Sequence, residues 1–453
     1  MNFRAITVKL FLLVTTFTSS FGLFTNVSLS TIFNENKPLV GFALTTLGKI
    51  LNPTAASTTQ RPAGFTSKLT KLLASLLNIP PEVYFSTHQH ILQQGYPAEE
   101  HFVVTPDGYI LTVNRIPGPR HSRGRSRSPD VVLMMTATLS SSSDYIVSSP
   151  NHSLAYLLAD AGYDVWLGNV RGTRDGRNHT RLNPDKDRRF WNFSIDDVAR
   201  YDYPALASYI TRHAGVERFF FVGFSAANRC LFMSASAPNS FIDKIRLSVS
   251  LAPALGTEQS SPFMSFFSKI FSGIRGAVEK FNGGQFYHGN DFMMSLIYIA
   301  CSDRSKLRPI CLRLIATIMG GMHSGYDGKD KLAFAMNSVL SGTSNKAAQH
   351  QAQINTSPVL RMFNYGAGNM AAYGSEKPPA YNLSLVSAPV ALFVSPDDRL
   401  MPIGGLESLK KSLTNVVVTH FIKQPDYGHM DLIFSDSAKE LVYDHVLPLM
   451  KLF

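Results

Sequence analysis

The chain has 453 residues, of which 45% are hydrophobic and 17% are charged, and its formal net charge at pH 7 is +11. These values exclude a chain dominated by disorder, and the length accommodates one large α/β domain with an insertion or two ordinary domains. The basic charge is spread along the chain without a zinc knuckle, an RNA-recognition motif or a platform of aromatic and basic residues. We therefore expect a solvated surface and no nucleic-acid partner.

The first 22 residues have the pattern of a secretory signal peptide. Arg4 and Lys9 precede the apolar run 10–14, and small residues follow up to Gly22. A membrane anchor is the alternative, but this run is shorter than the roughly 20 apolar residues of a spanning helix, and no later segment qualifies. We therefore expect a secreted or lysosomal protein that is monomeric and has no transmembrane anchor.

The glycosylation sequons and the cysteines agree with passage through the secretory pathway. Six Asn-x-Ser/Thr sequons, each a weak pattern by itself, lie at Asn26, Asn151, Asn178, Asn192, Asn355 and Asn382. The cysteines are Cys230, Cys301 and Cys311, and in an oxidising compartment the last two are close enough in sequence to close a small loop. Cys230 would then be unpaired and buried.

The part of the chain before the first strands has little regular pattern. Residues 23–80 lack a clear hydrophobic period and contain the linker-like stretch 52–59, which indicates a poorly ordered leader. Beyond it, the strand-like runs 101–104 and 110–115 are joined by Thr-Pro-Asp-Gly, which predicts a β-hairpin. The basic segment 120–128 is expected to be a solvated loop rather than a nucleic-acid-binding arm.

From residue 131 onward, apolar strands alternate with helices, which is typical of βαβ units and a mostly parallel sheet. Strands are expected at 131–135, 164–167 and 218–222, and helices near 154–161 and 205–213. The alternation stops after residues 251–253 and resumes at 390–394. We therefore predict an α/β core in two parts, 81–254 and 386–453, with a helical cap at 255–385 inserted between them.

The predicted cap contains one amphipathic stretch at helical spacing. Its apolar side consists of Phe263, Phe266, Phe267, Ile270, Ile274, Ala277, Val278 and Phe281. A helix packed on the core would have this pattern. A lid that covers an apolar cleft and opens at a lipid surface would have it too, and the pattern alone does not separate the two.

Ser225 lies where a strand is expected to turn sharply into a helix. The apolar run 219–222 leads into Gly223-Phe224-Ser225-Ala226-Ala227, and residues 228–237 can be helical. Such a turn exposes the serine hydroxyl above the sheet and needs small residues two positions before and after the serine. Ser225 is therefore a candidate nucleophile, with Ala227 in place of the usual second glycine. Taken alone, the pattern fits an ordinary serine at a strand-to-helix turn equally well.

A base and an acid for this serine follow in the order Ser, Asp, His. The loop after the strand 390–394 offers two carboxylates, Asp397 and Asp398. The strand 416–421 is followed by a loop that contains His429, a candidate general base. A surface histidine is the structural alternative, but its coincidence with the other two features favours catalysis.

From about residue 83 to its end, the sequence resembles the acid lipases, the family of gastric and lysosomal lipases with an α/β-hydrolase fold. The similar segments include GYPAEEHFVVTPDGYILTVNRIP, NHSLAYLLADAGYDVWLGNVRG, FWNFSIDDVARYDYPA and SGTS at 341–344. The resemblance implies that Ser225 is the nucleophile, Asp398 the acid and His429 the base. It also implies a disulfide between Cys301 and Cys311.

Two departures from the family concern the oxyanion hole. The family has Gly-His-Ser-Gln-Gly at the elbow and His-Gly-Leu after the first long strand, where this chain has Thr136-Ala137-Thr138. The oxyanion donors of this fold are backbone N–H groups, here those of Ala226 and Thr138, and such donors survive side-chain changes. If Ala137 in place of the family's glycine displaces this loop, the loss of one donor would lower the rate of hydrolysis about 100- to 1,000-fold.

The sequence thus predicts a lipase that hydrolyses lipid esters such as acylglycerols or sterol esters, with transient contact to a lipid interface and no metal or organic cofactor. A secreted lipid-binding protein that kept the fold and lost the activity is the main alternative, because the oxyanion loop is altered. An esterase or acyltransferase for smaller substrates is a third.

Overall fold

The computed structural model describes residues 70, 74–120, 130–137, 139–237, 241–255, 268, 283–319, 326 and 328–453. The predicted signal peptide, Asn26, most of the predicted leader and residues 121–128 of the basic segment lie outside the described residues. So do Thr138 and all of the predicted amphipathic cap helix except Ser268.

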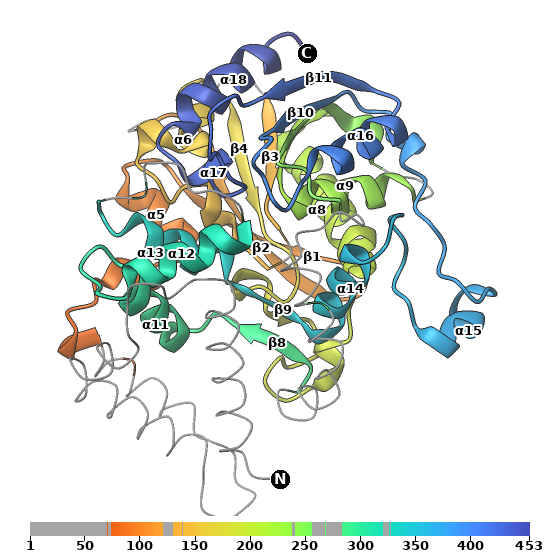
Figure 1. Cartoon of the computed structure of the whole chain (residues 1–453), viewed down its shortest axis with the longest axis horizontal. Helices are drawn as coiled ribbons and strands as arrows, with labels where there is room; N and C mark the ends of the chain where they lie inside the picture. The colour runs from red at the N-terminus through yellow and green to blue at the C-terminus, as the bar shows by residue number, and fades with distance from the viewer. Residues whose placement is uncertain are drawn as a thin grey trace, which may run out of the picture. The chain divides into compact units, whose positions relative to one another are not determined.

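A twisted sheet forms the centre of the described part of the chain (Figure 1). Its strands are β1 (Glu99–Val104), β2 (Tyr109–Ile116), β3 (Val131–Met135), β4 (Asp164–Gly168), β5 (Asn178–His179), β6 (Phe219–Phe224), β7 (Ile245–Leu251), β10 (Val390–Val394) and β11 (Val416–Phe421). Their order is β1-β2-β4-β3-β6-β7-β10-β11, and β5 pairs with β2. Neighbours from β4 to β11 are parallel, whereas β2 is antiparallel to β1 and β4, so the mostly parallel sheet and the hairpin are confirmed.

Apolar cores lie on both faces of the sheet, because successive side chains of a strand point to opposite faces. In β3, Val132 and Met134 belong to one core, and Leu133 and Met135 belong to the other. Parallel strands buried on both faces need continuous apolar runs, which is the pattern of β3 and β6.

Helices cover both faces of this sheet. Residues of α5 (Thr87–Gln93), α6 (Leu154–Asp160), α17 (Asp431–Phe434) and α18 (Asp444–Met450) join the first core. Residues of α7 (Ile195–Asp197), α8 (Tyr203–Ala214), α9 (Ala226–Ala235) and α16 (Ile403–Ser412) join the second. This three-layer arrangement is that of an α/β fold.

The predicted cap range holds mostly helices. Its elements are β8 (Gln285–His288), α11 (Asp291–Cys301), α12 (Arg308–Met319), α13 (Lys331–Val339), β9 (Gly342–Ser344), α14 (Asn345–Asn355) and α15 (Asn369–Tyr373). In Figure 1, α11, α12 and α13 lie together, and the expected disulfide between Cys301 and Cys311 joins α11 to α12. Cys230 is free and buried, as expected. The division into core and cap stays a prediction.

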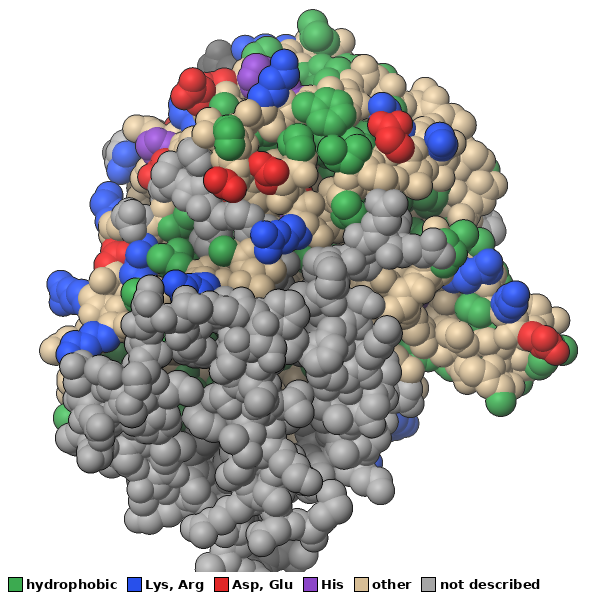
Figure 2. Space-filling model, in the orientation of Figure 1, with side chains coloured by type: hydrophobic (Ala, Val, Ile, Leu, Met, Phe, Trp, Pro, Cys, Tyr) green, Lys and Arg blue, Asp and Glu red, His purple; other side chains and the backbone are tan. Residues whose placement is uncertain are grey.

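The surface of the described residues mixes charges of both signs. Figure 2 shows lysine and arginine side chains in several separate places on one face, with acidic side chains among them. None of the helices in the described ranges combines the length and apolar character that a membrane-spanning helix needs.

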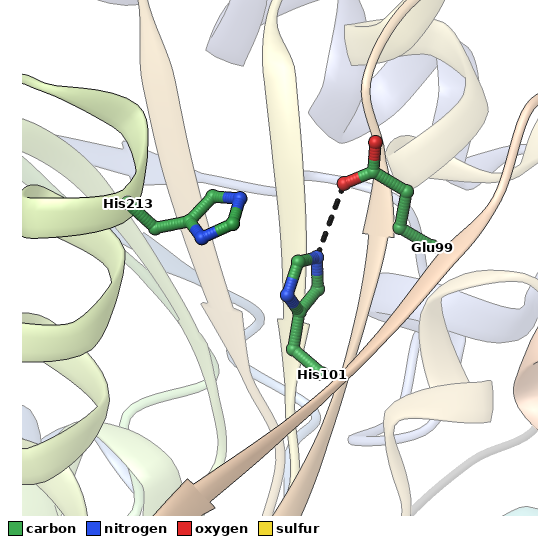
Figure 3. Close-up of side chains that lie close together, drawn as sticks. All are labelled: Glu99, His101 and His213. Carbon is green, nitrogen blue, oxygen red and sulfur yellow. Dashed lines mark hydrogen bonds and ion pairs between the residues drawn. The ribbon is translucent and has the colours of Figure 1, made fainter.

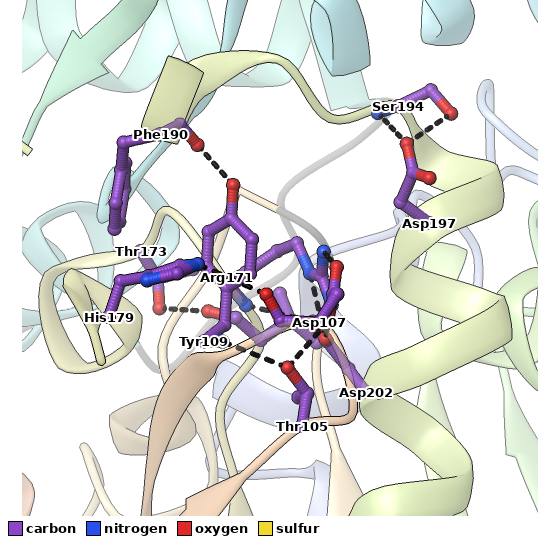
Figure 4. Close-up of polar contacts among 11 residues, drawn as sticks. Thr105, Asp107, Tyr109, Arg171, Thr173, His179, Phe190, Ser194, Asp197 and Asp202 are labelled. Atoms are coloured by element: carbon purple, nitrogen blue, oxygen red, sulfur yellow. Dashed lines mark hydrogen bonds and ion pairs between the residues drawn. The ribbon is translucent and has the colours of Figure 1, made fainter. Parts of the chain in front are cut away.

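A buried arginine joins the hairpin to the start of α8 (Figure 4). The guanidinium of Arg171 donates to Asp202 at 2.8 Å and to Asp107 at 2.6 and 2.9 Å, and it lies over the ring of Tyr109. Burial opposes the charge of Arg171, but the two carboxylates outweigh it, so the pKa of the guanidinium is raised. The neighbouring Tyr203 donates to the carbonyl of Ala227, which links this network to α9.

Replacing this arginine by an apolar residue should destabilise the fold strongly. In Arg171→Met the side chain of Asp202, which is 0% exposed, loses its cationic partner. We expect the free energy of unfolding to fall by about 3–5 kcal/mol, because a buried carboxylate is left unpaired. Urea unfolding measures this, with Lys439→Met, which breaks a solvent-exposed pair with Asp444, as the control. The control should lose less than about 1 kcal/mol, and an equally small loss in Arg171→Met would contradict the prediction.

Candidate active site

Ser225 occupies the sharp turn between β6 and α9. Its backbone has φ 56° and ψ −124°, which few residues other than glycine adopt, and its N–H donates to the carbonyl of Leu251 at 2.9 Å. The strain is held by its surroundings, as is typical of a nucleophile at a strand-to-helix turn. Ser225 is nearly buried, with 8% of its surface exposed, at the start of α9.

The turn leaves no room for a side chain at Gly223. A Cβ there would lie 2.3 Å from Oδ1 of Asn228, which is far too close for real atoms. The amide of Asn228 donates to the carbonyls of Gly223, Ser225 and Leu251 at 3.0–3.2 Å and ties the turn to β7. Ala227 is fully buried, so the methyl group that replaces the usual glycine hydrogen is accommodated. The sequence pattern did not single out Asn228.

Three side chains that are far apart in the sequence meet in this region. Nε2 of His429 lies 2.8 Å from Oγ of Ser225, and Nδ1 of His429 lies 2.7 Å from Oδ2 of Asp398. The three residues follow β6, β11 and β10, whose carboxyl ends lie at the same edge because these strands are parallel. Asp398 and His429 are 3% and 2% exposed, so both hydrogen bonds are shielded from water.

The orientation of Asp398 is set by its own backbone loop. Its Oδ1 accepts the N–H groups of Leu400 at 2.8 Å and Met401 at 3.0 Å, which leaves Oδ2 to face the imidazole. The carboxylate of Asp397 instead accepts a hydrogen bond from the backbone N–H of Asp426. Of the two carboxylates that the sequence offers, Asp398 is therefore the one that contacts His429.

The loop of His429 is held from two sides. The backbone N–H of His429 donates to the carbonyl of Met319 at the end of α12, at 3.1 Å. The N–H of Gly428 donates to the carboxylate of the buried Asp431 at 2.6 Å, which closes the loop onto α17. The ring centroid of Phe224 lies 5.0 Å from the centroid of the His429 imidazole. These contacts fix the position of the ring between Ser225 and Asp398.

Of the two expected oxyanion donors, Ala226 lies within the described residues and Thr138 does not. Ala226 is the first residue of α9, where backbone N–H groups have no acceptor within the helix and favour negative charge. The loop that follows Thr138 is tied to the end of α13 and to the segment before β9. Ser341 N–H donates to the Leu139 carbonyl at 2.8 Å, and Ser141 N–H donates to the Ser338 carbonyl at 3.0 Å.

The same loop leads to a buried carboxyl that the sequence pattern did not reveal. Asp144 is 1% exposed and accepts a hydrogen bond from the hydroxyl of Ser338 at 2.5 Å. Burial raises the pKa of the Asp144 carboxyl from its ordinary 3.8 to about 7, although hydrogen bonds from Ser338 and Ser140 oppose the shift. This carboxyl therefore titrates near neutral pH beside the oxyanion loop.

This shift makes the stability of the fold depend on pH. Between pH 4 and pH 7 the folded state keeps the Asp144 proton that the unfolded state loses, so stability falls as pH rises. The loss is on the order of 4 kcal/mol across this window. In Asp144→Asn the amide stays neutral and can still accept from Ser338, so we expect a smaller fall in melting temperature from pH 5 to pH 8.

The matched control is Asp243→Asn. Asp243 also accepts a serine hydroxyl, that of Ser387 at 2.7 Å, but it is exposed. Circular dichroism melts at several pH values compare the two variants with the wild type. A wild-type melting temperature that does not fall over this range, or an unchanged slope in Asp144→Asn, would refute the assignment.

The described sequons differ in exposure. Asn151, Asn178, Asn192 and Asn382 are exposed, so a glycan could be attached to each. Asn355 is only 8% exposed and accepts a hydrogen bond from Gln351, and its burial argues against a glycan there. Glycosylation at the other positions stays a prediction.

Sequence profiles of two protein families match this chain. The profile described as alpha/beta hydrolase fold matches residues 132–436, and the one described as partial alpha/beta-hydrolase lipase region matches residues 87–149. The first range covers most of the chain and includes Ser225, Asp398 and His429. The chain therefore belongs to the α/β-hydrolase fold family.

Several named lipases are similar to it over most of their length. Human lipase member K is 32% identical over 380 residues, which cover 83% of this chain and 92% of that protein. Lipase 1 of Drosophila melanogaster is 31% identical over 378 residues, covering 82% and 81%. Bovine gastric triacylglycerol lipase is 30% identical over 372 residues, covering 82% and 92%. These relatives confirm the resemblance to the acid lipases.

Proposed function

We propose that this chain is a lipase that hydrolyses carboxylic esters of lipids through an acyl-enzyme on Ser225. The observation that carries the proposal is the continuous pair of hydrogen bonds from Ser225 through His429 to Asp398, at 2.8 and 2.7 Å. These distances are those at which a base removes a serine proton and a carboxylate orients the base.

Acylation uses each of these groups in turn. Nδ1–H of His429 donates to Asp398, so Nε2 has a lone pair for the hydroxyl proton of Ser225. As this proton moves to Nε2, Oγ attacks the ester carbonyl carbon, and the carbonyl oxygen becomes an oxyanion. The N–H of Ala226, at the positive end of α9, donates to this oxyanion.

Collapse of the tetrahedral intermediate returns the proton. The imidazolium of His429 protonates the leaving alcohol as the carbon–oxygen bond breaks, which leaves the acyl group on Ser225. Water then gives a proton to Nε2 and attacks the acyl carbon, and the carboxylic acid leaves as Ser225 regains its hydrogen. The proposed chemistry requires no metal or organic cofactor.

The lipid nature of the substrate is supported by the relatives. Their names are those of lipases, and one is a gastric triacylglycerol lipase. We extend this to acylglycerols or sterol esters as substrates, with transient contact at a lipid interface. The signal-peptide pattern of residues 1–22 supports secretion or delivery to lysosomes.

The test combines labelling with hydrolysis. A fluorescent alkylphosphonate that reacts with activated serines should label the secreted protein, and peptide mapping should place the label on Ser225. The labelled protein should lose hydrolysis of emulsified triacylglycerol and cholesteryl ester, each assayed from pH 4 to pH 8. Wild-type protein that is neither labelled nor active on short- and long-chain esters would refute the proposal.

The rival function is lipid binding without turnover. Thr136-Ala137 in place of the family's His-Gly favours it, because this loop precedes an expected oxyanion donor. The rival predicts that a fluorescent fatty ester binds the wild type and is recovered intact. Release of the free fatty acid in the same sample would exclude it.

A further inference from the structure

A second cluster of reactive side chains lies at the edge of the sheet (Figure 3). Glu99 and His101 are two residues apart on β1, so their side chains share one face of the strand. His213 comes from the last turn of α8, and its ring lies nearly perpendicular to that of His101, with 4.7 Å between the ring centroids. Three strands, β2, β4 and β3, separate β1 from β6, so this cluster is distinct from the site at Ser225.

The distances in the cluster are close to those of a metal site. One ligand atom from each of the three residues lies within 4.8 Å of the others. Nε2 of His101 and Oε2 of Glu99 are already 3.1 Å apart. Ligand atoms at about 2.0–2.2 Å from a tetrahedral zinc ion lie about 3.3 Å from one another. His213 is exposed, so a modest rotation of its side chain would bring its nitrogen to that distance.

The surroundings also favour a cation. Nδ1 of His101 lies 3.0 Å from the hydroxyl of Tyr209, and metal-binding histidines are commonly oriented through their second nitrogen in this way. The guanidinium of Arg115 contacts both Glu99 and Asp164. Two carboxylates around one guanidinium leave a net negative charge, which attracts a divalent ion.

We propose that Glu99, His101 and His213 bind a zinc ion that joins the end of α8 to the edge strand β1. Two imidazoles and one carboxylate are a ligand set that zinc accepts, and water would complete the coordination on the exposed side. Because His213 is exposed, the ion can enter from solvent on that side of the cluster.

Zinc binding to the purified, untagged full-length protein tests this proposal. After treatment with a chelator, the protein is titrated with Zn²⁺ by calorimetry and in competition with a chromophoric chelator. We expect one ion per chain and a higher melting temperature with zinc. His213→Ala should weaken binding at least about tenfold, because loss of even an indirect partner of a metal ligand costs that much. Alanine suits an exposed helical position, so the variant should fold.

A second readout uses the tryptophan beside the cluster. The centroid of the Trp166 ring system lies 4.8 Å from the ring centroid of His101 and 5.5 Å from that of His213. Cu²⁺ bound there should quench part of the intrinsic fluorescence in the wild type and much less in His213→Ala. The control, His152→Ala, removes a histidine that contacts Ser149 outside the cluster and should bind both ions like the wild type.

Two outcomes would overturn the zinc proposal. One is wild-type protein that binds no zinc below millimolar concentration, and the other is His213→Ala that binds zinc as the wild type does. Neither measurement involves ester hydrolysis, so failure of the zinc site leaves the proposed lipase activity unaffected.

Discussion

Ser225→Ala is expected to lower kcat for ester hydrolysis by about 10⁴- to 10⁶-fold, the range found when a serine nucleophile of this kind is removed. The variant lacks the oxygen that forms the acyl-enzyme, whereas His429 and Asp398 keep their mutual hydrogen bond. Hydrolysis of a p-nitrophenyl ester, with product measured over hours, covers this range.

The fold of this variant should remain intact. The backbone N–H at position 225 still donates to Leu251, and Asn228 still holds the turn through backbone carbonyls. Circular dichroism should therefore give a melting temperature close to that of the wild type. Ser412→Ala, at an exposed serine at the end of α16, is the control and should retain full activity. Substantial hydrolysis by folded Ser225→Ala would exclude the proposed nucleophile.

Asp398→Asn should lower kcat about 10⁴-fold while leaving the geometry nearly unchanged. The N–H groups of Leu400 and Met401 both point at Oδ1, so the amide oxygen of the asparagine must take that place. Its NH₂ group then faces Nδ1 of His429 and donates to it. The imidazole proton is forced onto Nε2, where it faces Ser225 and no lone pair remains for the hydroxyl proton.

The neighbouring carboxylate provides a matched control. Asp397 accepts a backbone N–H from Asp426, and the amide oxygen of Asp397→Asn can do the same. We expect this variant to keep activity within a few-fold of the wild type. The pH profile of kcat/KM should also differ from that of the wild type in Asp398→Asn and should resemble it in Asp397→Asn. Equal losses in both would show that the loop, and not the carboxylate at position 398, matters.

Much of the architecture could be predicted from local patterns. The strand expected at 131–135 is β3 with the same bounds, because a continuous apolar run of that length can be buried on both faces only in a central strand. The helix expected at 205–213 begins two residues earlier, at Tyr203, because Pro204 is compatible with the first turn of a helix. The short strands β5, β8 and β9 were missed, since two to four residues carry no periodic signal.

The candidate site was predictable only in part. The strand-turn-helix pattern indicated Ser225, and the order of motifs indicated an acid and a base. Without the family resemblance, however, the sequence offered Asp397 and Asp398 equally. The difference between them is the direction of two backbone N–H groups in a loop, which no residue type encodes. Asn228 and Asp144 gave no signal either, because their roles depend on burial and on distant carbonyl and hydroxyl groups.

Local composition and spacing are therefore enough to predict the α/β class, the alternation of the longer strands and helices of the sheet, and the serine at the turn, because these depend on residues close together in the chain. The pairing of Asp398 with His429, the raised pKa of Asp144 and the approach of His213 to β1 arise only in the folded chain. Each depends on groups tens to hundreds of residues apart, which only the assembled sheet and its helices bring into contact.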